Sequence, residues 1–171
     1  GGALSDWLIQ HLRSQHGVHV MRMDRSTTGA GGDDPAALQR QTLRHYDAHS
    51  RTLHLSAHLQ PGQQAFQLGT QLALLELAPQ IEQLLTTAHW QDKATRRLAR
   101  IGLANYAAGA LVLPYGAFLQ AADSLRYDID LLGQRFAVGF ETVCHRLSTL
   151  QRQDNPGVPF FFVRVDRAGN I

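Results

Sequence analysis

The nine histidines are the residues of this sequence best suited to bind a metal ion. The nearest pair with ligand spacing is His45 and His49, an H-x-x-x-H pattern with Asp47 between them. On a helix this spacing places two imidazoles one turn apart, as zinc sites require. The surrounding residues instead alternate between apolar and polar as in a strand, so the two side chains would not converge. His54 and His58 also follow strand-like sequence, and we therefore predict no metal site and no resident cofactor.

A second candidate for chemistry is Cys144, the only cysteine, which is followed directly by His145. Adjacent side chains on a helix diverge by about 100°, so the two cannot form a nucleophile–base pair. The sequence also lacks the G-x-S-x-G, P-loop and G-x-G-x-x-G motifs. A single cysteine cannot form an internal disulfide, which favours an intracellular, cytoplasmic protein. We therefore expect no catalytic residue in this chain.

Residues 128–150 have the pattern of two short helices around Gly139, and such a pair could be a DNA-reading helix–turn–helix. Thr142, His145 and Arg146 would then lie on the second helix. Glu141 near the start of that helix would repel phosphate, and the segment carries little net positive charge. Plain structural helix pairs are also common. A DNA-binding module in residues 128–150 therefore stays an alternative rather than the favoured interpretation.

The segment from Tyr106 to Phe118, YAAGALVLPYGAF, combines small residues with aromatic ones. A helix rich in Ala and Gly leaves space for a ligand to approach the backbone, and the aromatics could line a narrow apolar pocket. Tight packing of the same helix against a neighbour would use the same residues. Both interpretations stay open from the residues alone.

Length and patterning bound the fold. The chain has 171 residues, of which 44% are hydrophobic, with a formal net charge of +2, so it fits one ordinary domain or a domain with a small appendage. No apolar run approaches the roughly 20 residues of a membrane span, and we expect no membrane association. Ser5 is placed to cap a first helix that Gly17 ends, and Pro61-Gly62 is typical of a turn. Further elements are predicted as strand 18–23, loop 26–35, a helical turn at 36–41, a β-hairpin around 47–50, helices 65–77, 79–87, 92–113, 118–125, 128–137 and 140–150, and a strand from Pro159.

This order predicts an α+β fold in which helices pack on a small, mainly antiparallel sheet. The final residues, PFFFVRVDRAGNI, have the pattern of one strand entering a turn. We expect the chain to be a fragment of a longer protein that is cut within this hairpin. The predicted division is a ligand-binding domain in residues 1–125, followed in 126–171 by a helical pair and the first strand of a truncated C-terminal part.

The hairpin, the F-x-L-(small)-x-x-L segment from Phe66 and the helix ending A-N-x-(aromatic)-A-A-x-x-L with Pro114 resemble the ImmA/IrrE metallopeptidase-like domain. In that family the first of these helices carries H-E-x-x-H. Here that register falls on residues 70–74, TQLAL, and residues 100–103 before Asn105 offer no carboxylate as a third ligand. Glu76 alone cannot hold zinc, so the metal route to an activated water is lost. A zinc-dependent peptidase acting on a repressor is the alternative that these residues argue against.

Longer stretches, among them ANYAAGALVLPYGAFLQAA and GVPFFFVRVDRAGN, resemble the short-chain fatty acyl-CoA transcriptional regulators of the propionate-catabolism type. The resemblance covers residues 4–171. It implies a ligand-sensing domain that binds a short-chain acyl-CoA, with propionyl-CoA favoured, and that is not an enzyme. It also implies that DNA is bound only through an N-terminal domain outside this chain, and that a cysteine-bearing C-terminal region lies outside it too.

The resemblance suggests where such a ligand would bind. The acyl group would enter the slot left by the lost zinc ligands, Gln71 or Tyr106 would hydrogen-bond the thioester carbonyl, and cations at the start of a helix would bind the phosphates. A homodimer is expected, since such regulators usually bind paired half-sites. The candidate ligand-binding residues are Gln71, Lys93, Arg96, Arg97, Tyr106, Ala108, Leu111, Tyr115, Phe118 and Tyr127, with Arg135 and Arg164 as further options for the phosphates.

Overall fold

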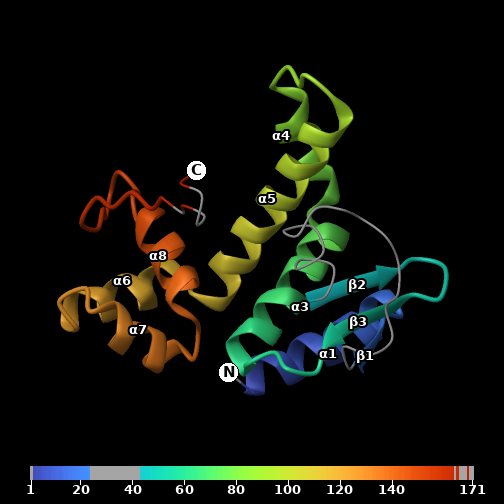
Figure 1. The fold of residues 1–171 in the computed structure, drawn as a ribbon, viewed down its shortest axis with the longest axis horizontal. Coiled ribbons are helices and arrows are strands. Elements are labelled where there is room, and N and C mark those ends of the chain that lie inside the picture. The colour runs from blue at the N-terminus through green and yellow to red at the C-terminus, as the bar shows by residue number, and fades with distance from the viewer. Residues whose placement is uncertain (1, 24–42, 164, 166–168, 170–171) are drawn as a thin grey trace. The chain divides into compact units, whose positions relative to one another are not determined.

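The computed structural model describes residues 2–23, 43–163, 165 and 169, and the chain divides into two compact units, residues 1–112 and 113–171. The described residues form seven helices and three strands (Figure 1), which confirms the α+β class. The predicted loop at 26–35 and helical turn at 36–41 lie outside the described residues. The boundary between the units falls between Val112 and Leu113. The predicted domain division after residue 125 stays a prediction.

The first helix, α1 (Gly2–His16), buries Ser5, Leu8 and Leu12 on one face. Gly17 ends it in the left-handed conformation, with φ +62°, and its N–H donates to the Arg13 carbonyl oxygen at 3.1 Å. Glycine adopts this conformation without the steric cost of a Cβ atom. The predicted N-cap role of Ser5 is wrong, because the helix already begins at Gly2 and the Ser5 hydroxyl lies 3.5 Å from the carbonyl oxygen of Pro61.

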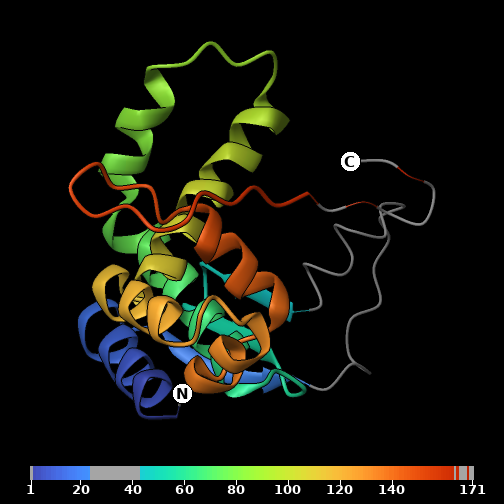
Figure 2. The ribbon, with the colours of Figure 1, turned by 90° about the vertical axis from the view of Figure 1, so that its left-hand side faces the viewer.

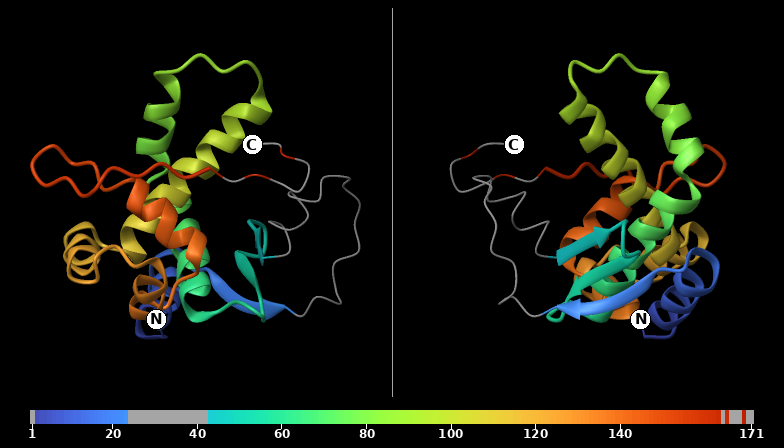
Figure 3. Two further views of the ribbon diagram at one scale, coloured as in Figure 1. Left: turned by 60° about the vertical axis from the view of Figure 1, so that its left-hand side comes forward. Right: turned by 90° about the vertical axis from the view of Figure 1, so that its right-hand side faces the viewer.

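The sheet contains β1 (His19–Met23), β2 (Arg44–Asp47) and β3 (Thr52–Ser56) in the order β1-β3-β2, as the right-hand view of Figure 3 shows. β2 and β3 pair antiparallel, which confirms the predicted hairpin. The Asp47 carboxylate holds the turn between them by accepting hydrogen bonds from the Ser50 hydroxyl at 2.6 Å and the His49 backbone N–H at 2.9 Å. β1 pairs parallel to β3, so the sheet is mixed and not mainly antiparallel as predicted, because alternation alone does not reveal strand direction.

The second layer of this unit is a pair of packed helices, α3 (Pro61–Glu76) and α5 (Lys93–Val112). The predicted turn at Pro61-Gly62 is wrong, because Pro61 occupies the first turn of α3, where its missing N–H costs nothing. The Gln60 backbone N–H donates to the Gln63 side chain at 3.0 Å and so caps this end. The helices approach closely where Gly69 meets Ala108, since a Cβ atom added to Gly69 would lie 3.4 Å from the Ala108 Cβ.

A short helix, α4 (Ala78–Thr86), connects α3 to the segment that leads into α5. Figure 1 shows α4 and the first turns of α5 at the end of this unit that is farther from the sheet. The Trp90 indole N–H donates to the Leu85 carbonyl oxygen at 2.6 Å and so closes this end of the unit. The buried cluster between α3, α4 and α5 consists of Ala73, Ile81, Leu85 and Ala104, with Leu74, Trp90, Ala99, Leu103 and Ala107 packed against it.

The second unit contains α6 (Tyr115–Ser124), α7 (Ile129–Phe136) and α8 (Phe140–Ser148), visible together in Figure 2. The predicted helix pair around Gly139 is confirmed as α7 and α8. Asp128 caps α7 by accepting the Leu131 backbone N–H at 2.9 Å, and Ala137 ends it with φ +54°. The fully buried core of this unit includes Leu113, Phe118, Leu132, Val143, Leu147 and Leu150.

After α8 the described residues form neither helix nor strand, so the predicted strand from Pro159 is wrong for residues 159–163. No single helix in the described part of the chain has the length and apolar character of a membrane span. Only α5 and α6 taken together have that length and composition, and a break separates them.

Candidate functional site

The centre of α3 occupies the register where the resembling peptidases carry their zinc-binding motif. Thr70 and Gln71 are only 1% and 2% exposed there. The Thr70 hydroxyl lies 2.9 Å from the Phe66 carbonyl oxygen and 3.2 Å from Asn105 Oδ1 on α5. The Gln71 side-chain oxygen accepts a hydrogen bond from Arg44 Nη1 at 2.8 Å, and burial lowers the pKa of that guanidinium. Both polar side chains thus bind neighbouring elements of the protein itself.

This arrangement bears on the predicted role of Gln71. Its carbonyl oxygen is occupied by Arg44, so a thioester carbonyl would have to use the Gln71 amide N–H groups as donors. Leu72 and Ala73 next to it are buried as well. The middle of α3 therefore acts as a packed, internally hydrogen-bonded element in this conformation.

The three predicted phosphate-binding cations lie in the first turns of α5 and are not equivalent. Arg96 forms an ion pair with Glu82 of α4, and Arg100 Nε lies 3.4 Å from the other oxygen of the same carboxylate. Lys93 and Arg97 are exposed and form no ion pair within the described part of the chain. Lys93 and Arg97 are therefore the more available cations for an anionic ligand, because Glu82 already offsets the charge of Arg96.

The second half of α5 carries three further predicted residues that do not share a face. Ala108 is fully buried against Gly69, so at this position the helix-packing interpretation holds. Tyr106, two residues earlier, is 59% exposed and points away from that contact. Side chains two positions apart on a helix diverge by about 200°. Leu111 is 37% exposed and lies near Gly69, so it borders the contact with α3 on the solvent side.

The remaining three predicted residues belong to the second unit. The Tyr115 hydroxyl donates to the Asn155 carbonyl oxygen at 2.9 Å, and the Arg152 guanidinium lies 4.3 Å from its ring centre. The Tyr127 hydroxyl donates to Asp123 at 2.8 Å and accepts from the Val158 backbone N–H at 3.2 Å; burial is the main cause that raises its pKa. Phe118 is fully buried and packs on Phe136.

These contacts show what the two tyrosines do in this unit. Tyr115, the first residue of α6, and Tyr127, which follows α6, both hold the segment after α8, because their hydroxyls bond to backbone atoms between residues 152 and 158. Of the further options for phosphate, Arg135 is exposed on the last turn of α7, and Arg164 lies outside the described residues. The predicted residues therefore fall into a group on α3 and α5 and a group in the second unit.

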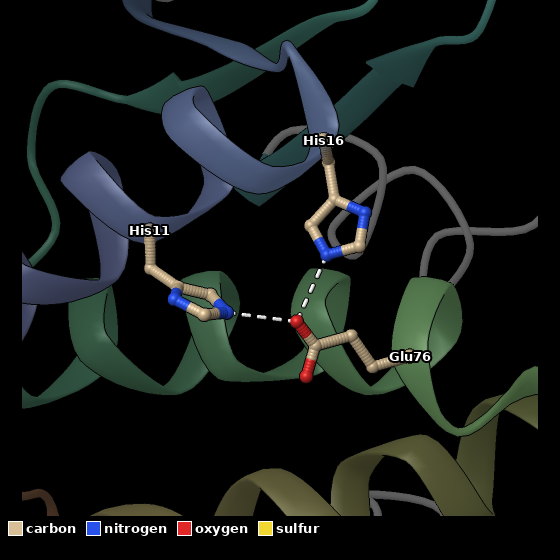
Figure 4. A group of neighbouring side chains, drawn as sticks. All are labelled: His11, His16 and Glu76. Carbon is tan, nitrogen blue, oxygen red and sulfur yellow. Dashed lines mark hydrogen bonds and ion pairs between the residues drawn. The ribbon is translucent and has the colours of Figure 1, made fainter.

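One cluster of ligand-type side chains forms only in the folded protein. His11 and His16 of α1 both point toward Glu76 at the end of α3 (Figure 4), with their Nε2 atoms 2.8 Å and 2.9 Å from its Oε1 atom. The hydrogen bonds from His16 and then His11 lower the pKa of Glu76. No local sequence signal joins Glu76 to histidines 60 and 65 positions away, so the sequence alone does not predict this cluster.

The chain is similar to known proteins in its family matches, its sequence and its fold. Residues 13–148 match the family described as the IrrE N-terminal-like domain, and residues 149–171 match the short-chain fatty acyl coenzyme A regulator, C-terminal family. The chain is 47% identical over 170 residues to the HTH-type transcriptional regulator PrpR of Mycobacterium tuberculosis, covering 99% of this chain and 32% of that protein. It is 52% identical over 119 residues to the propionyl-CoA carboxylase regulator of Cereibacter sphaeroides, covering 70% and 26% of the two chains.

A solved structure titled Mycobacterium tuberculosis transcriptional regulator matches with a TM-score of 0.85 and 47% identity, covering 99% of this chain and 48% of that one. The chain spans 32% and 26% of the length of these two curated relatives.

Proposed function

This chain belongs to the family of IrrE N-terminal-like domains, and we propose that it is the ligand-sensing part of a bacterial transcriptional regulator that binds a short-chain acyl-CoA. Propionyl-CoA is the favoured ligand. The observation that carries the proposal is the match of residues 149–171 to the short-chain fatty acyl coenzyme A regulators. The names of PrpR, a transcriptional regulator, and of the propionyl-CoA carboxylase regulator also support a regulatory role linked to propionyl-CoA.

The residues at the centre of α3 favour sensing over peptide hydrolysis. A zinc peptidase of this family needs two histidines and a glutamate in the register where this chain has Thr70, Gln71 and Leu74. Thr70 and Gln71 are buried and hydrogen-bonded to Asn105 and Arg44. We therefore propose that the chain is not an enzyme and that the peptidase scaffold is used for binding.

The exposed face of α5 offers the chemistry that CoA requires. CoA is elongated, with phosphates at one end and the acyl thioester at the other. Lys93 and Arg97 are exposed cations at the start of α5, where the helix N-terminus adds positive potential. Leu111 lies 14 residues beyond Arg97, about 21 Å along the helix. An elongated ligand could therefore place its phosphates at Arg97 and its acyl group toward Leu111.

A thermal-shift panel tests this function. We expect propionyl-CoA to raise the melting temperature more than free CoA does, because only the acylated ligand fills the apolar part of the site. One methylene is worth about 0.8 kcal/mol, so propionyl-CoA should bind about fourfold more tightly than acetyl-CoA by burial alone. Equal shifts with free CoA and every acyl-CoA would contradict an acyl sensor.

A charge variant locates the phosphates. Arg97→Ala should weaken acyl-CoA binding about tenfold, which corresponds to the loss of one charge-assisted hydrogen bond. Arg13→Ala, an exposed arginine of α1, is the matched control and should leave the affinity unchanged. Equal affinity of the Arg97→Ala variant and the parent chain would remove α5 as the phosphate site. Cleavage of a repressor by the purified chain would instead favour the peptidase.

A further inference from the structure

The cluster of His11, His16 and Glu76 joins the end of α1 to the end of α3 (Figure 4). Its three ligand atoms, two imidazole nitrogens and a carboxylate oxygen, all lie within 4.8 Å of one another. Glu76 is 65 positions from His11 and 60 from His16 along the chain, so it is the fold that brings them together. The cluster is also distinct from the register of the lost peptidase motif at residues 70–74.

The donor set is one that divalent transition metals prefer. Two imidazoles and one carboxylate with an open fourth position form a zinc site found in proteins. With zinc–ligand bonds of about 2.0–2.1 Å, neighbouring ligand atoms in a tetrahedron are about 3.3 Å apart. The present distances from the two Nε2 atoms to Glu76 Oε1 are 2.8 Å and 2.9 Å. A metal ion would therefore require the Glu76 oxygen to move slightly away from both imidazoles. The two imidazole nitrogens lie within 4.8 Å of each other and would adjust to the same spacing of about 3.3 Å.

The surroundings orient one of the rings and leave access from solvent. The Trp7 ring stacks on the His11 ring, with centroids 4.8 Å apart and planes inclined by 17°. A shallow, open hollow on the surface of α1 is lined by Trp7, Gln10, His11 and Ser14, so it includes one residue of the cluster. The side chains of His11, His16 and Glu76 are 27%, 24% and 40% exposed. An ion can therefore reach the cluster and retain water at its remaining position.

The competing interpretation is a carboxylate that simply accepts two hydrogen bonds. In that state each neutral imidazole carries its proton on Nε2 and donates it to Oε1. In the metal state each Nε2 is a bare ligand and the ring proton lies on Nδ1. Both states use the same three side chains, so a measurement must separate them.

We propose that His11, His16 and Glu76 bind one divalent transition metal ion, best fitted by zinc, which ties the C-terminal end of α1 to that of α3. Such an ion bound only to the folded state stabilises it by mass action. This site is independent of acyl-CoA binding, and its presence or absence leaves the proposed function untouched.

The test is zinc binding by the untagged, chelator-treated chain, measured by equilibrium dialysis with elemental analysis. We expect one zinc ion per chain and a higher melting temperature with zinc than without it. His16→Asn and Glu76→Gln should each weaken zinc binding at least about tenfold, since each removes one of three ligands. Binding that is unchanged in both variants, or no saturable binding at all, would overturn the site.

A matched control comes from the sheet, where His45 and His54 are cross-strand partners with ring centres 6.2 Å apart. The double variant His45→Asn/His54→Asn should retain the bound zinc ion. Loss of binding in this control, with retention in His16→Asn, would place the ion on the sheet and overturn the proposal. Melting curves without zinc show that each variant is folded before its affinity is compared.

A spectroscopic readout reports position directly. Trp7 stacks on His11, whereas Trp90 bonds to Leu85 at the other end of the unit. In a Trp90→Phe background, Ni²⁺ should quench the remaining Trp7 fluorescence in a saturable way. The further change Glu76→Gln should shift that quenching to higher Ni²⁺ concentration. Quenching that is identical in both backgrounds would contradict a site that includes Glu76.

Discussion

Two places on the same helix contrast sharply in how they use polar side chains. At the centre of α3, Thr70 and Gln71 are almost fully buried and bind Asn105 and Arg44. At the end of α3, the Glu76 side chain is 40% exposed and meets two imidazoles from α1. The first place has the register in which the resembling peptidases carry H-E-x-x-H, and its polar side chains are hydrogen-bonded within the protein. The second has a metal-type donor set that remains open to solvent.

The difference follows from burial. A buried polar group must be paired within the protein, because leaving it unpaired costs about 1–3 kcal/mol. Pairing of this kind fixes the side chain and removes it from ligand chemistry. A partly exposed group can exchange its partner for water or an ion at little cost. The resemblance to a metallopeptidase points to the centre of α3 as the metal site. The ligand atoms that solvent can reach lie instead at the end of α3, on Glu76 and its two histidine partners.

The largest expected effect is at Gln71. Gln71→Leu keeps most of the volume but leaves the partly buried Arg44 guanidinium without its acceptor. We expect a loss of about 1.5–3 kcal/mol in the free energy of unfolding, the range for hydrogen bonds to charged groups. Chemical denaturation measures it. The double variant Arg44→Leu/Gln71→Leu should recover part of the loss, since no polar group is left unpaired. A Gln71→Leu variant as stable as the parent chain would contradict a stabilising hydrogen bond between Gln71 and Arg44.

A smaller effect is expected at Thr70. Thr70→Val removes the hydroxyl that reaches Asn105 while keeping a β-branched side chain of similar size. The loss of a neutral hydrogen bond should cost about 1 kcal/mol in unfolding free energy, measured in the same way. Thr86→Val, where the hydroxyl bonds only within its own exposed helix turn, is the control and should cost less. Equal costs at the two positions would mean that the bond between α3 and α5 adds nothing.

The smallest effect is expected at Glu76 when no metal is present. Partly exposed ion pairs typically contribute about 0–1 kcal/mol, so Glu76→Gln should change the stability of the chelator-treated chain only slightly. The measurement is the melting temperature in chelator. A loss of stability as large as that of Gln71→Leu would contradict this expectation. It would show that Glu76, like Gln71, is required for the stability of the fold.

Much of the fold could be predicted from local signals. The β2–β3 hairpin and the α7–α8 pair were visible because alternation, turn residues and capping residues lie within a few positions of one another. Pro61 misled the prediction because proline suits a turn and a first helical turn equally well. The parallel pairing of β1 with β3 depends on a connection between distant segments, and no local pattern encodes it.

The candidate site was less accessible to sequence reasoning. The difference between residues 70–74, TQLAL, and an H-E-x-x-H motif could be read directly from the sequence. The partners of those residues could not, because Arg44 and Asn105 come from other elements. Tyr106 and Ala108 were assigned to one pocket, yet one is exposed and the other buried on opposite sides of α5. The ligand itself was inferred from resemblance and stays a prediction.

The most direct test of the account is an isothermal titration of propionyl-CoA into the chelator-treated chain. We expect saturable binding of one ligand per chain without any added metal, with an affinity higher than that for free CoA. Glu76→Gln should leave this affinity unchanged, because the end of α3 is separate from the proposed acyl-CoA site. Binding that requires zinc, or an affinity no higher than that for free CoA, would contradict the proposed metal-independent acyl-CoA sensor.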